Sequence, residues 1–185
     1  LVPGDAFTGA LTREGGEEVG EYDILQGTLA LNGNYDLTFV GALLTITPAT
    51  GAPLDISNYS DVYDGMSHSI TVNNLITGDT AYYRLNAEDE WSTTLPTFTD
   101  VTDEVTVYVK VTNPNYEDRT GIGTVKITPK AVTVTANSDS FVYDGTEKTV
   151  SGYTVTGLLA GHELHDVGAT RTEKNVGDYE VPVTG

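Results

Sequence analysis

The chain contains no cysteine, a single tryptophan and few basic residues. Without cysteine it has no disulfide, no zinc–thiolate site and no cysteine nucleophile. Nine Lys and Arg stand against 27 Asp and Glu, which gives a formal net charge of −18. Nucleic-acid binding depends on clustered Lys and Arg that contact phosphates. We therefore expect no nucleic-acid partner.

Long apolar runs are also missing. The longest is about residues 39–44, whereas a membrane helix needs about 18 apolar residues in succession. The first residues have neither the basic start nor the apolar centre of a signal peptide. We expect no membrane insertion.

What the sequence does contain is an alternation of strand-forming and turn-forming residues. Residues 106–112 read Thr-Val-Tyr-Val-Lys-Val-Thr, with three valines on one face, and residues 131–136 repeat the pattern. A period of two with one apolar face is typical of a strand in an antiparallel sheet. Turn signals such as Asn32-Gly33 and Thr77-Gly78-Asp79 recur at intervals of about 8–12 residues, as in β-sandwiches. The pattern predicts an all-β fold of tandem immunoglobulin-like β-sandwich modules.

The chain also repeats itself. Residues 34–48 align with residues 115–129 at an offset of 81, and both segments end in Ile-Thr-Pro. The motif Tyr63-Asp64-Gly65 returns as Tyr143-Asp144-Gly145 at an offset of 80. Self-similarity at a fixed period indicates a repeat architecture.

Two Thr-Pro pairs mark the ends of modules, because proline cannot extend a strand ladder. Pro48 and Pro129 each follow an alternating segment. They predict three units: residues 1–48, the C-terminal part of an immunoglobulin-like repeat; residues 49–129, a complete repeat; and residues 130–185, the N-terminal part of a third.

The incomplete outer units have two expected consequences. Each presents a bare strand edge, so we expect strand exchange between molecules or head-to-tail pairing of the ends. Each also depends on contacts with its neighbour, as in other repeat arrays. The junction at 127–134 has almost no spacer and should be stiff, whereas the junction at 47–54 places Gly51 between two prolines and should be freer.

Several of these segments together resemble a family of bacterial immunoglobulin-like repeats, the MBG or YDG domains. They are the Tyr63-Asp64-Gly65 motif, the stretch from Trp91 to Asp100, residues 107–116 and residues 127–132. Residues 1–48 resemble the closing half of a neighbouring subtype. The resemblance implies an extracellular, secreted or wall-attached surface protein or adhesin, in which such repeats act as spacers between a functional head and the anchor. It brings no catalytic motif and no cofactor.

Aromatic residues suggest one candidate binding site. Trp91 with Tyr82 and Tyr83 would form a platform for a sugar. The alternative is structural: Trp91 begins a strand after a turn and packs on Tyr83 or Leu85. Tyr63 and Tyr143 recur at one position of the repeat, so we expect a structural role for them, packing over the Asp-Gly turn that follows.

Metal sites have weaker support. His162 and His165 resemble the zinc-protease pattern, but they are three residues apart in a β context and would point to opposite faces. We expect a solvated loop there, and an isolated surface residue at His68.

The acidic segments 88–90 and 100–104 offer oxygen ligands for a structural Ca²⁺ but lack the spaced ligand series. We favour solvated acidic edges, which also oppose aggregation.

Catalytic patterns are missing as well. No Ser/His/Asp set shares a motif, and no glycine-rich loop precedes a helix. We expect a non-catalytic stalk or spacer of a bacterial surface protein, with neighbouring repeats as its partners. The alternative is a carbohydrate- or protein-binding adhesin module that recognises a host or surface glycan or protein.

Overall fold

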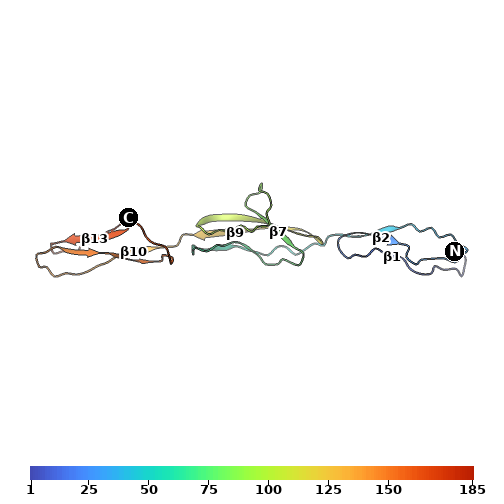
Figure 1. The fold of residues 1–185 in the computed structure, drawn as a ribbon, viewed down its shortest axis with the longest axis horizontal. Coiled ribbons are helices and arrows are strands. Elements are labelled where there is room, and N and C mark those ends of the chain that lie inside the picture. The colour runs from blue at the N-terminus through green and yellow to red at the C-terminus, as the bar shows by residue number, and fades with distance from the viewer. The chain divides into compact units, whose positions relative to one another are not determined.

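A computed structural model describes all residues 1–185, and it consists of strands and loops without any helix (Figure 1). The prediction of an all-β fold is confirmed, and the several small sheets are consistent with β-sandwiches. None of the chain forms a helix that could cross a membrane.

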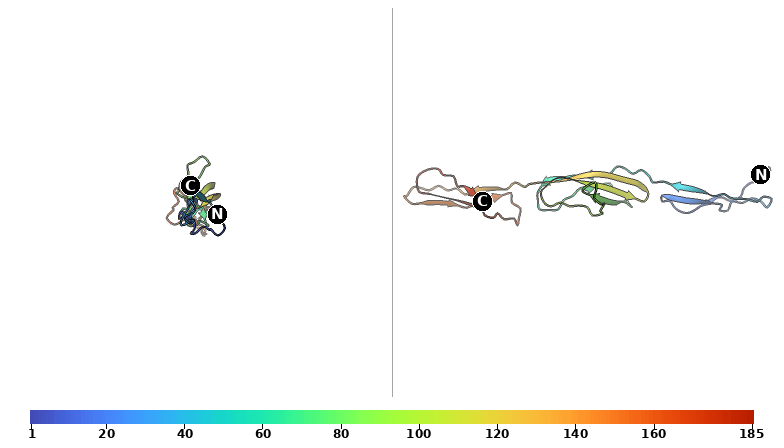
Figure 2. Two further views of the ribbon diagram at one scale, coloured as in Figure 1. Left: turned by 90° about the vertical axis from the view of Figure 1, so that its right-hand side faces the viewer. Right: turned by 90° about the horizontal axis from the view of Figure 1, so that it is seen from above.

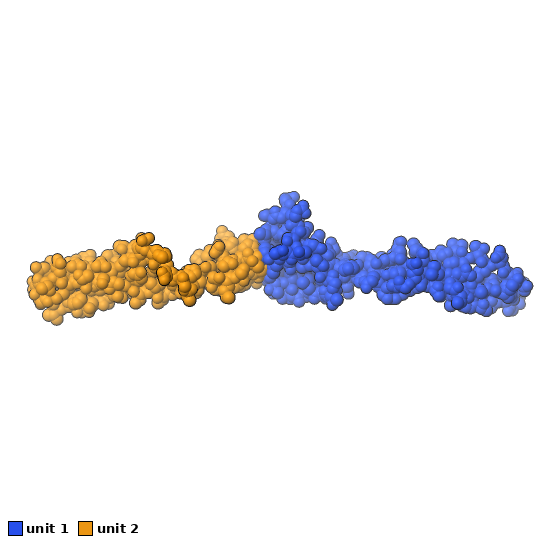
Figure 3. Space-filling model, viewed as in Figure 1, with its two compact units in different colours: residues 1–57, 70–96, 106–123 blue, residues 58–69, 97–105, 124–185 orange.

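The chain divides into two compact units (Figure 3). The first contains Leu1–Ser57, Ile70–Pro96 and Thr106–Gly123, and the second contains Asn58–Ser69, Thr97–Val105 and Thr124–Gly185. The limits of the units fall inside residues 49–129, and the strands β8 (Thr102–Asn113) and β9 (Tyr116–Thr128) contribute residues to both. The three-repeat division of the chain stays a prediction.

The N-terminal residues form a three-stranded antiparallel sheet in the order β1-β2-β3. Its strands are β1 (Thr12–Arg13), β2 (Gly20–Leu25) and β3 (Ala42–Ile46). Tyr22 lies opposite Leu44. Since β3 has a neighbour on one side only, its other edge carries no ladder.

The central sheet has four strands in the order β5-β9-β8-β7. Its outer strands are β5 (Tyr59–Val62) and β7 (Thr80–Arg84). Figure 2 shows the long strands β8 and β9 side by side. β7 pairs antiparallel with β8, whereas β5 pairs parallel with β9. A separate two-stranded sheet contains β4 (Ile56–Ser57) and β6 (Thr71–Val72).

The core of the central segment, residues 49–129, is built from one face of each of the long strands β8 and β9. Val107, Val109 and Val111 are at most 1% exposed, as their alternation predicted. On β9, Val125 and Ile127 are at most 2% exposed. Period two therefore places every second residue of β8 inside, with polar residues between them.

A glycine on β9 allows a second layer to approach. A Cβ atom at Gly123 would lie 2.7 Å from Cγ2 of Ile56 and 2.8 Å from Cγ2 of Ile70. Both distances are too short for a real contact, so no larger residue fits without a shift of this layer.

The C-terminal residues form two small antiparallel sheets. One pairs β10 (Thr133–Ala136) with β12 (Tyr153–Thr156). The other has the order β11-β13-β14, with β11 (Lys148–Ser151), β13 (Gly168–Glu173) and β14 (Val183–Thr184). Residues 137–147 form no strand.

The segment between Pro48 and Leu54, expected to be the freer junction, is hydrogen-bonded to the strands that follow it. The Ala49 N–H donates to the Asn115 carbonyl at 3.0 Å, and the Glu117 N–H donates to the Ala49 carbonyl at 3.0 Å. Arg119 donates to the Ala52 carbonyl at 3.3 Å. This segment pairs with the free edge of the first residues of β9. The Gly and Pro residues of the segment give no indication of that partner.

We expect Gly123→Ala to lower the free energy of unfolding by about 1–3 kcal/mol, the usual cost of overpacking. Gly33→Ala is the matched control, because no atom lies within 4 Å of a Cβ at that position. Urea unfolding followed by tryptophan fluorescence measures both. Equal stability of the two variants would show that the layers at Gly123 are not closely packed.

Candidate functional site

The repeated Tyr-Asp-Gly motif forms a tight turn after β5. Gly65 has φ +80°, in the left-handed region that glycine favours. An Asp64 carboxylate oxygen accepts the Met66 N–H at 2.8 Å and lies 2.9 Å from Nε2 of His68. The Tyr63 hydroxyl would be 3.9 Å from a Cβ at Gly65. Tyr63 therefore lies over the turn.

His68 has partners that the sequence analysis did not foresee. Its ring stacks on Tyr59 with the centroids 4.1 Å apart, and its side chain is 19% exposed. The hydrogen bond from His68 is the main cause that lowers the pKa of Asp64. Burial, followed by the nearby carboxylates, raises the pKa of Tyr59. The sequence contained one indication of this cluster, namely that His68 follows Asp64 by four residues.

The second copy of the motif keeps the turn but changes its closing residue. Gly145 also has φ +80°. Asp144 accepts the Thr146 N–H at 2.9 Å and the Lys148 ammonium at 2.6 Å. Lys148 stands 80 residues after His68, so a basic side chain closes both turns. The bond from Lys148 is the main cause that holds the pKa of Asp144 well below its ordinary value.

Within the second unit, the first of these turns touches the loop after β12. The His162 ring lies edge-on to the Tyr63 ring, with centroids 6.3 Å apart. A Cβ at Gly65 would be 3.4 Å from Cδ1 of Leu159. The expected solvated loop therefore has one aromatic contact.

The two tyrosines of the motif lie in different surroundings. Tyr143 is 62% exposed, and no atom lies within 4 Å of a Cβ at Gly145. The packing expected over the Asp-Gly turn is thus seen at Tyr63 but not at Tyr143.

We expect Tyr63→Ala to increase amide hydrogen exchange in residues 158–162, because their aromatic and apolar support is removed. Tyr143→Ala is the matched control and should leave exchange in this loop unchanged. Hydrogen–deuterium exchange with mass spectrometry compares the two. If Tyr63→Ala has no more effect than Tyr143→Ala, the contact does not hold the loop.

Within the first unit, the hairpin between β8 and β9 touches the residues before β2. The Val19 N–H donates to the Asn115 side-chain oxygen at 2.9 Å, and the Asn115 amide donates to Glu18. One asparagine therefore satisfies a backbone group and a carboxylate of the preceding segment.

A buried ion pair lies near the same hairpin. Arg119 is paired with Asp79, and their side chains are 8% and 1% exposed. Asp79 also accepts the Ile76 N–H at 2.8 Å and the Asn113 amide at 2.9 Å. Burial raises the pKa of Asp79, but these hydrogen bonds and the Arg119 charge outweigh it, so its pKa lies below the ordinary value.

We expect stability from Asp79 to be present above its unfolded-state pKa near 4 and to be lost as the pH falls through its lowered folded-state pKa. Asp79→Asn should weaken this acid dependence. At pH 7 it should also cost about 3–5 kcal/mol, because Arg119 is left buried without a counter-charge. Urea unfolding between pH 2 and 7 measures both effects. Asp118→Asn, an exposed position on β9, is the control, and equal loss in both variants would contradict the assignment.

The predicted aromatic platform is divided between two faces of the central sheet. Tyr82 lies opposite Lys110, whereas Tyr83 lies opposite the buried Val109. Successive residues of a strand point to opposite faces, so Tyr82 faces outward and Tyr83 inward. Burial raises the pKa of Tyr83.

Trp91 lies on the outer face and packs on a cation. The Arg84 guanidinium is 4.3 Å from its ring centroid, and the Lys110 ammonium is 5.2 Å from it. The Lys110 ammonium is also 5.4 Å from the Tyr82 ring. Trp91 and Tyr82 are thus linked through Lys110, and the expected packing of Trp91 on Tyr83 or Leu85 is replaced by stacking on Arg84.

We call Tyr82, Arg84, Trp91 and Lys110 the cationic face. Neither cation takes part in an ion pair, and Nε of Arg84 is buried without a hydrogen-bond partner. A hollow of about 330 Å³ adjoins it. The hollow is lined by Arg84, Trp91, Tyr108, Val109, Thr120, Gly121 and Ile122. Arg84 and Lys110 were not predicted as site residues. Alternation places Arg84 on the same face as Tyr82, whereas the position of Lys110 depends on the register between β7 and β8.

The acidic and histidine segments do not gather into a metal-binding arrangement. No three His, Asp or Glu side chains lie together at metal-ligand spacing. Asp89 instead accepts the Asn86 backbone N–H at 3.0 Å and its side-chain amide at 2.9 Å. In the acidic segment 88–90 this carboxylate closes a local turn.

The family model described as MBG domain (YGX type) matches residues 1–45. This confirms the predicted MBG-type resemblance over that segment. Searches among curated proteins and among solved structures found no match for the chain.

Proposed function

We propose that this chain is a set of non-catalytic spacer repeats from the stalk of an extracellular bacterial surface protein. The observation that carries the proposal is the match of residues 1–45 to the MBG domain. The internal offsets of 80 and 81 extend the same repeat to the rest of the chain. Its partners in this role are the neighbouring repeats.

Two features support a role in keeping repeats apart and oriented. The Asn115 side chain of the central repeat is hydrogen-bonded to Val19 and Glu18 of the preceding segment, which restricts the freedom of that joint. The net charge of −18 makes successive repeats repel each other over a screening length of about 8 Å at physiological ionic strength. Repeats with strands of this length would each add roughly 30–40 Å.

Small-angle X-ray scattering of the chain tests this role. A compact domain of 185 residues would have a radius of gyration of about 16 Å. A spacer should give a clearly larger value and a rod-like profile at both low and physiological salt. A radius near the compact value would overturn the proposal.

The cationic face supports a second function, the binding of a carbohydrate that carries a carboxylate. Arg84 covers part of Trp91, so this ring is poorly placed to stack on a neutral sugar. Two cations without acidic partners in so acidic a chain instead favour an anionic ligand, which the Lys110 ammonium and the Arg84 guanidinium would attract.

Titration with a glucuronic-acid oligosaccharide, followed by tryptophan fluorescence, tests the second function. We expect saturable quenching that is lost in Arg84→Met and kept in Lys126→Met, which removes an exposed cation of β9 outside the cationic face. No saturable response, or an equal loss in both variants, would contradict it.

A further inference from the structure

The turn at residues 32–35 contains the one Asn-Gly pair of the chain. The Tyr35 N–H donates to the Asn32 backbone carbonyl at 3.2 Å, and the Asn34 N–H donates to the Asn32 side-chain oxygen at 3.1 Å. The second of these bonds makes an Asx turn, in which the side chain mimics a backbone turn. The Asn32 side chain is therefore folded back over the next peptide unit, with its carbonyl carbon held close to the Gly33 nitrogen.

The Gly33 nitrogen is free to react. Its N–H makes no hydrogen bond, and no atom lies within 4 Å of a Cβ at that position. Asn32 and Gly33 are both exposed. Since glycine has no side chain, nothing hinders the approach of its nitrogen to the neighbouring carbonyl carbon. Water and hydroxide reach both reacting atoms.

We propose that Asn32 is a site of spontaneous deamidation. The Gly33 nitrogen loses its proton to hydroxide and attacks Cγ of Asn32, so that a new bond joins these two atoms. The bond from Cγ to Nδ2 then breaks, Nδ2 takes up a proton, and ammonia leaves behind a cyclic succinimide. Water opens this ring at either carbonyl and gives aspartate or isoaspartate. The proposal is independent of the stalk function, because it rests on this turn alone.

Two neighbours favour the reaction. The Asn34 N–H that contacts the side-chain oxygen stabilises the negative charge that develops there during the attack. The Asn32 amide nitrogen donates to an Asp5 carboxylate oxygen at 2.7 Å. Because this nitrogen gains a proton as it leaves, the Asp5 carboxylate stabilises it by a charge-assisted hydrogen bond.

The central segment contains the same turn without the attacking nitrogen. Asn113 stands 81 positions after Asn32. Its side-chain oxygen accepts the Asn115 N–H at 3.0 Å, and its amide nitrogen donates to an Asp79 carboxylate oxygen at 2.9 Å. The next residue is Pro114, which has no N–H and cannot attack. Since proline serves at this position, the turn needs no hydrogen bond from it.

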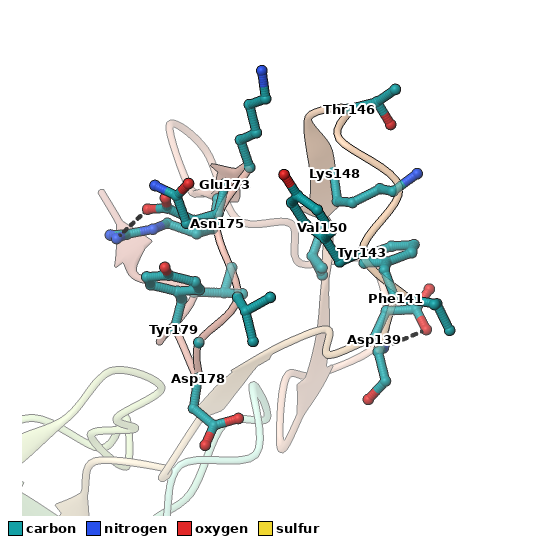
Figure 4. Close-up of a pocket in the computed structure, with 17 residues that line it drawn as sticks. Asp139, Phe141, Tyr143, Thr146, Lys148, Val150, Glu173, Asn175, Asp178 and Tyr179 are labelled. Atoms are coloured by element: carbon teal, nitrogen blue, oxygen red, sulfur yellow. Dashed lines mark hydrogen bonds and ion pairs between the residues drawn. The ribbon is translucent and has the colours of Figure 1, made fainter.

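Asn175 provides a second comparison. It is exposed and lines a hollow of about 390 Å³ in the second unit (Figure 4). The residue that follows is Val176, whose branched side chain crowds its own backbone nitrogen and hinders attack. We therefore expect that exposure of the amide alone does not make an asparagine of this chain reactive.

Deamidation changes the charge beside Asp5. The hydrogen bond from Asn32 is lost and a carboxylate takes its place, so that two negative groups face each other. Asp5 also accepts the Tyr35 hydroxyl at 2.7 Å. Close by along the chain, Thr8 and Ala30 are joined by two backbone hydrogen bonds of 2.9 Å. We expect the segment from Asp5 to Thr8 to open more often after the reaction.

Peptide mass spectrometry of the chain kept at pH 8 tests the proposal. We expect Asn32 to be converted at least about tenfold faster than Asn113 and Asn175, because neither has an unhindered nitrogen after it. The product should contain isoaspartate, which direct hydrolysis of the amide does not produce. The change in mass separates this reaction from rearrangement at the Asp-Gly pairs 64–65 and 144–145, which leaves the mass unchanged.

Gly33→Pro is the matched variant, because it gives the turn the sequence Asn-Pro-Asn-Tyr of residues 113–116. The variant fits the backbone, since Gly33 does not have a positive φ. It should abolish the formation of isoaspartate at Asn32. Conversion at the unmodified rate in Gly33→Pro would overturn the proposal, and so would conversion of Asn32 no faster than that of Asn175.

Asn32→Asp reproduces one of the two products without ageing and tests the consequence. The loss of a hydrogen bond to a charged group should raise amide hydrogen exchange at Thr8 and Ala30 about tenfold. Hydrogen–deuterium exchange with mass spectrometry compares Asn32→Asp with the unmodified chain. Unchanged exchange at both residues would overturn the predicted opening.

Discussion

The central segment depends on strand β9, which pairs with other strands along both of its edges and packs against a second layer with one face. β8 and β5 pair with it, and the segment around Ala49 pairs with its first residues. On its buried face Gly123 admits a second layer, and Arg119 forms the buried pair with Asp79. A long strand with these contacts joins parts of the chain that lie up to about seventy residues apart. The outer segments contain no strand of this length, and their side chains are correspondingly more exposed.

The Tyr-Asp-Gly turn shows how one local structure can serve two environments. Its backbone is the same at both sites, because glycine supplies the positive φ and aspartate accepts the following N–H groups. The basic residue four positions after the aspartate is His68 in one turn and Lys148 in the other. The first turn is therefore closed by an imidazole that also stacks on Tyr59, whereas the second is closed by an ammonium group. Tyr63 contacts a following loop, whereas Tyr143 is largely exposed.

Local patterns allowed much of this fold to be predicted. The alternating valines of β8 correctly predicted a buried face, and the Asp-Gly pairs correctly predicted turns. Apart from the local contact between Asp64 and His68, the features that were not predicted involve residues distant in the chain or residues that share a face of the sheet. The partner of Ala49 is 66 positions away at Asn115, and nothing in the Gly-Pro composition of the linker indicates it. The stacking of Trp91 on Arg84 depends on a strand register that period two alone leaves open. Of the three aromatic residues proposed as a sugar platform, Tyr82 and Trp91 lie near Lys110 on one face, whereas Tyr83 lies on the other face.

Residues 49–129 are predicted to form an autonomous module in a series whose proposed role is mechanical. Single-molecule force spectroscopy of the chain, held at its two ends, tests this most directly. Unfolding of that module should appear as its own event and release about 270–290 Å of contour before its folded length is subtracted. A single event that extends the whole chain at once would contradict the modular account.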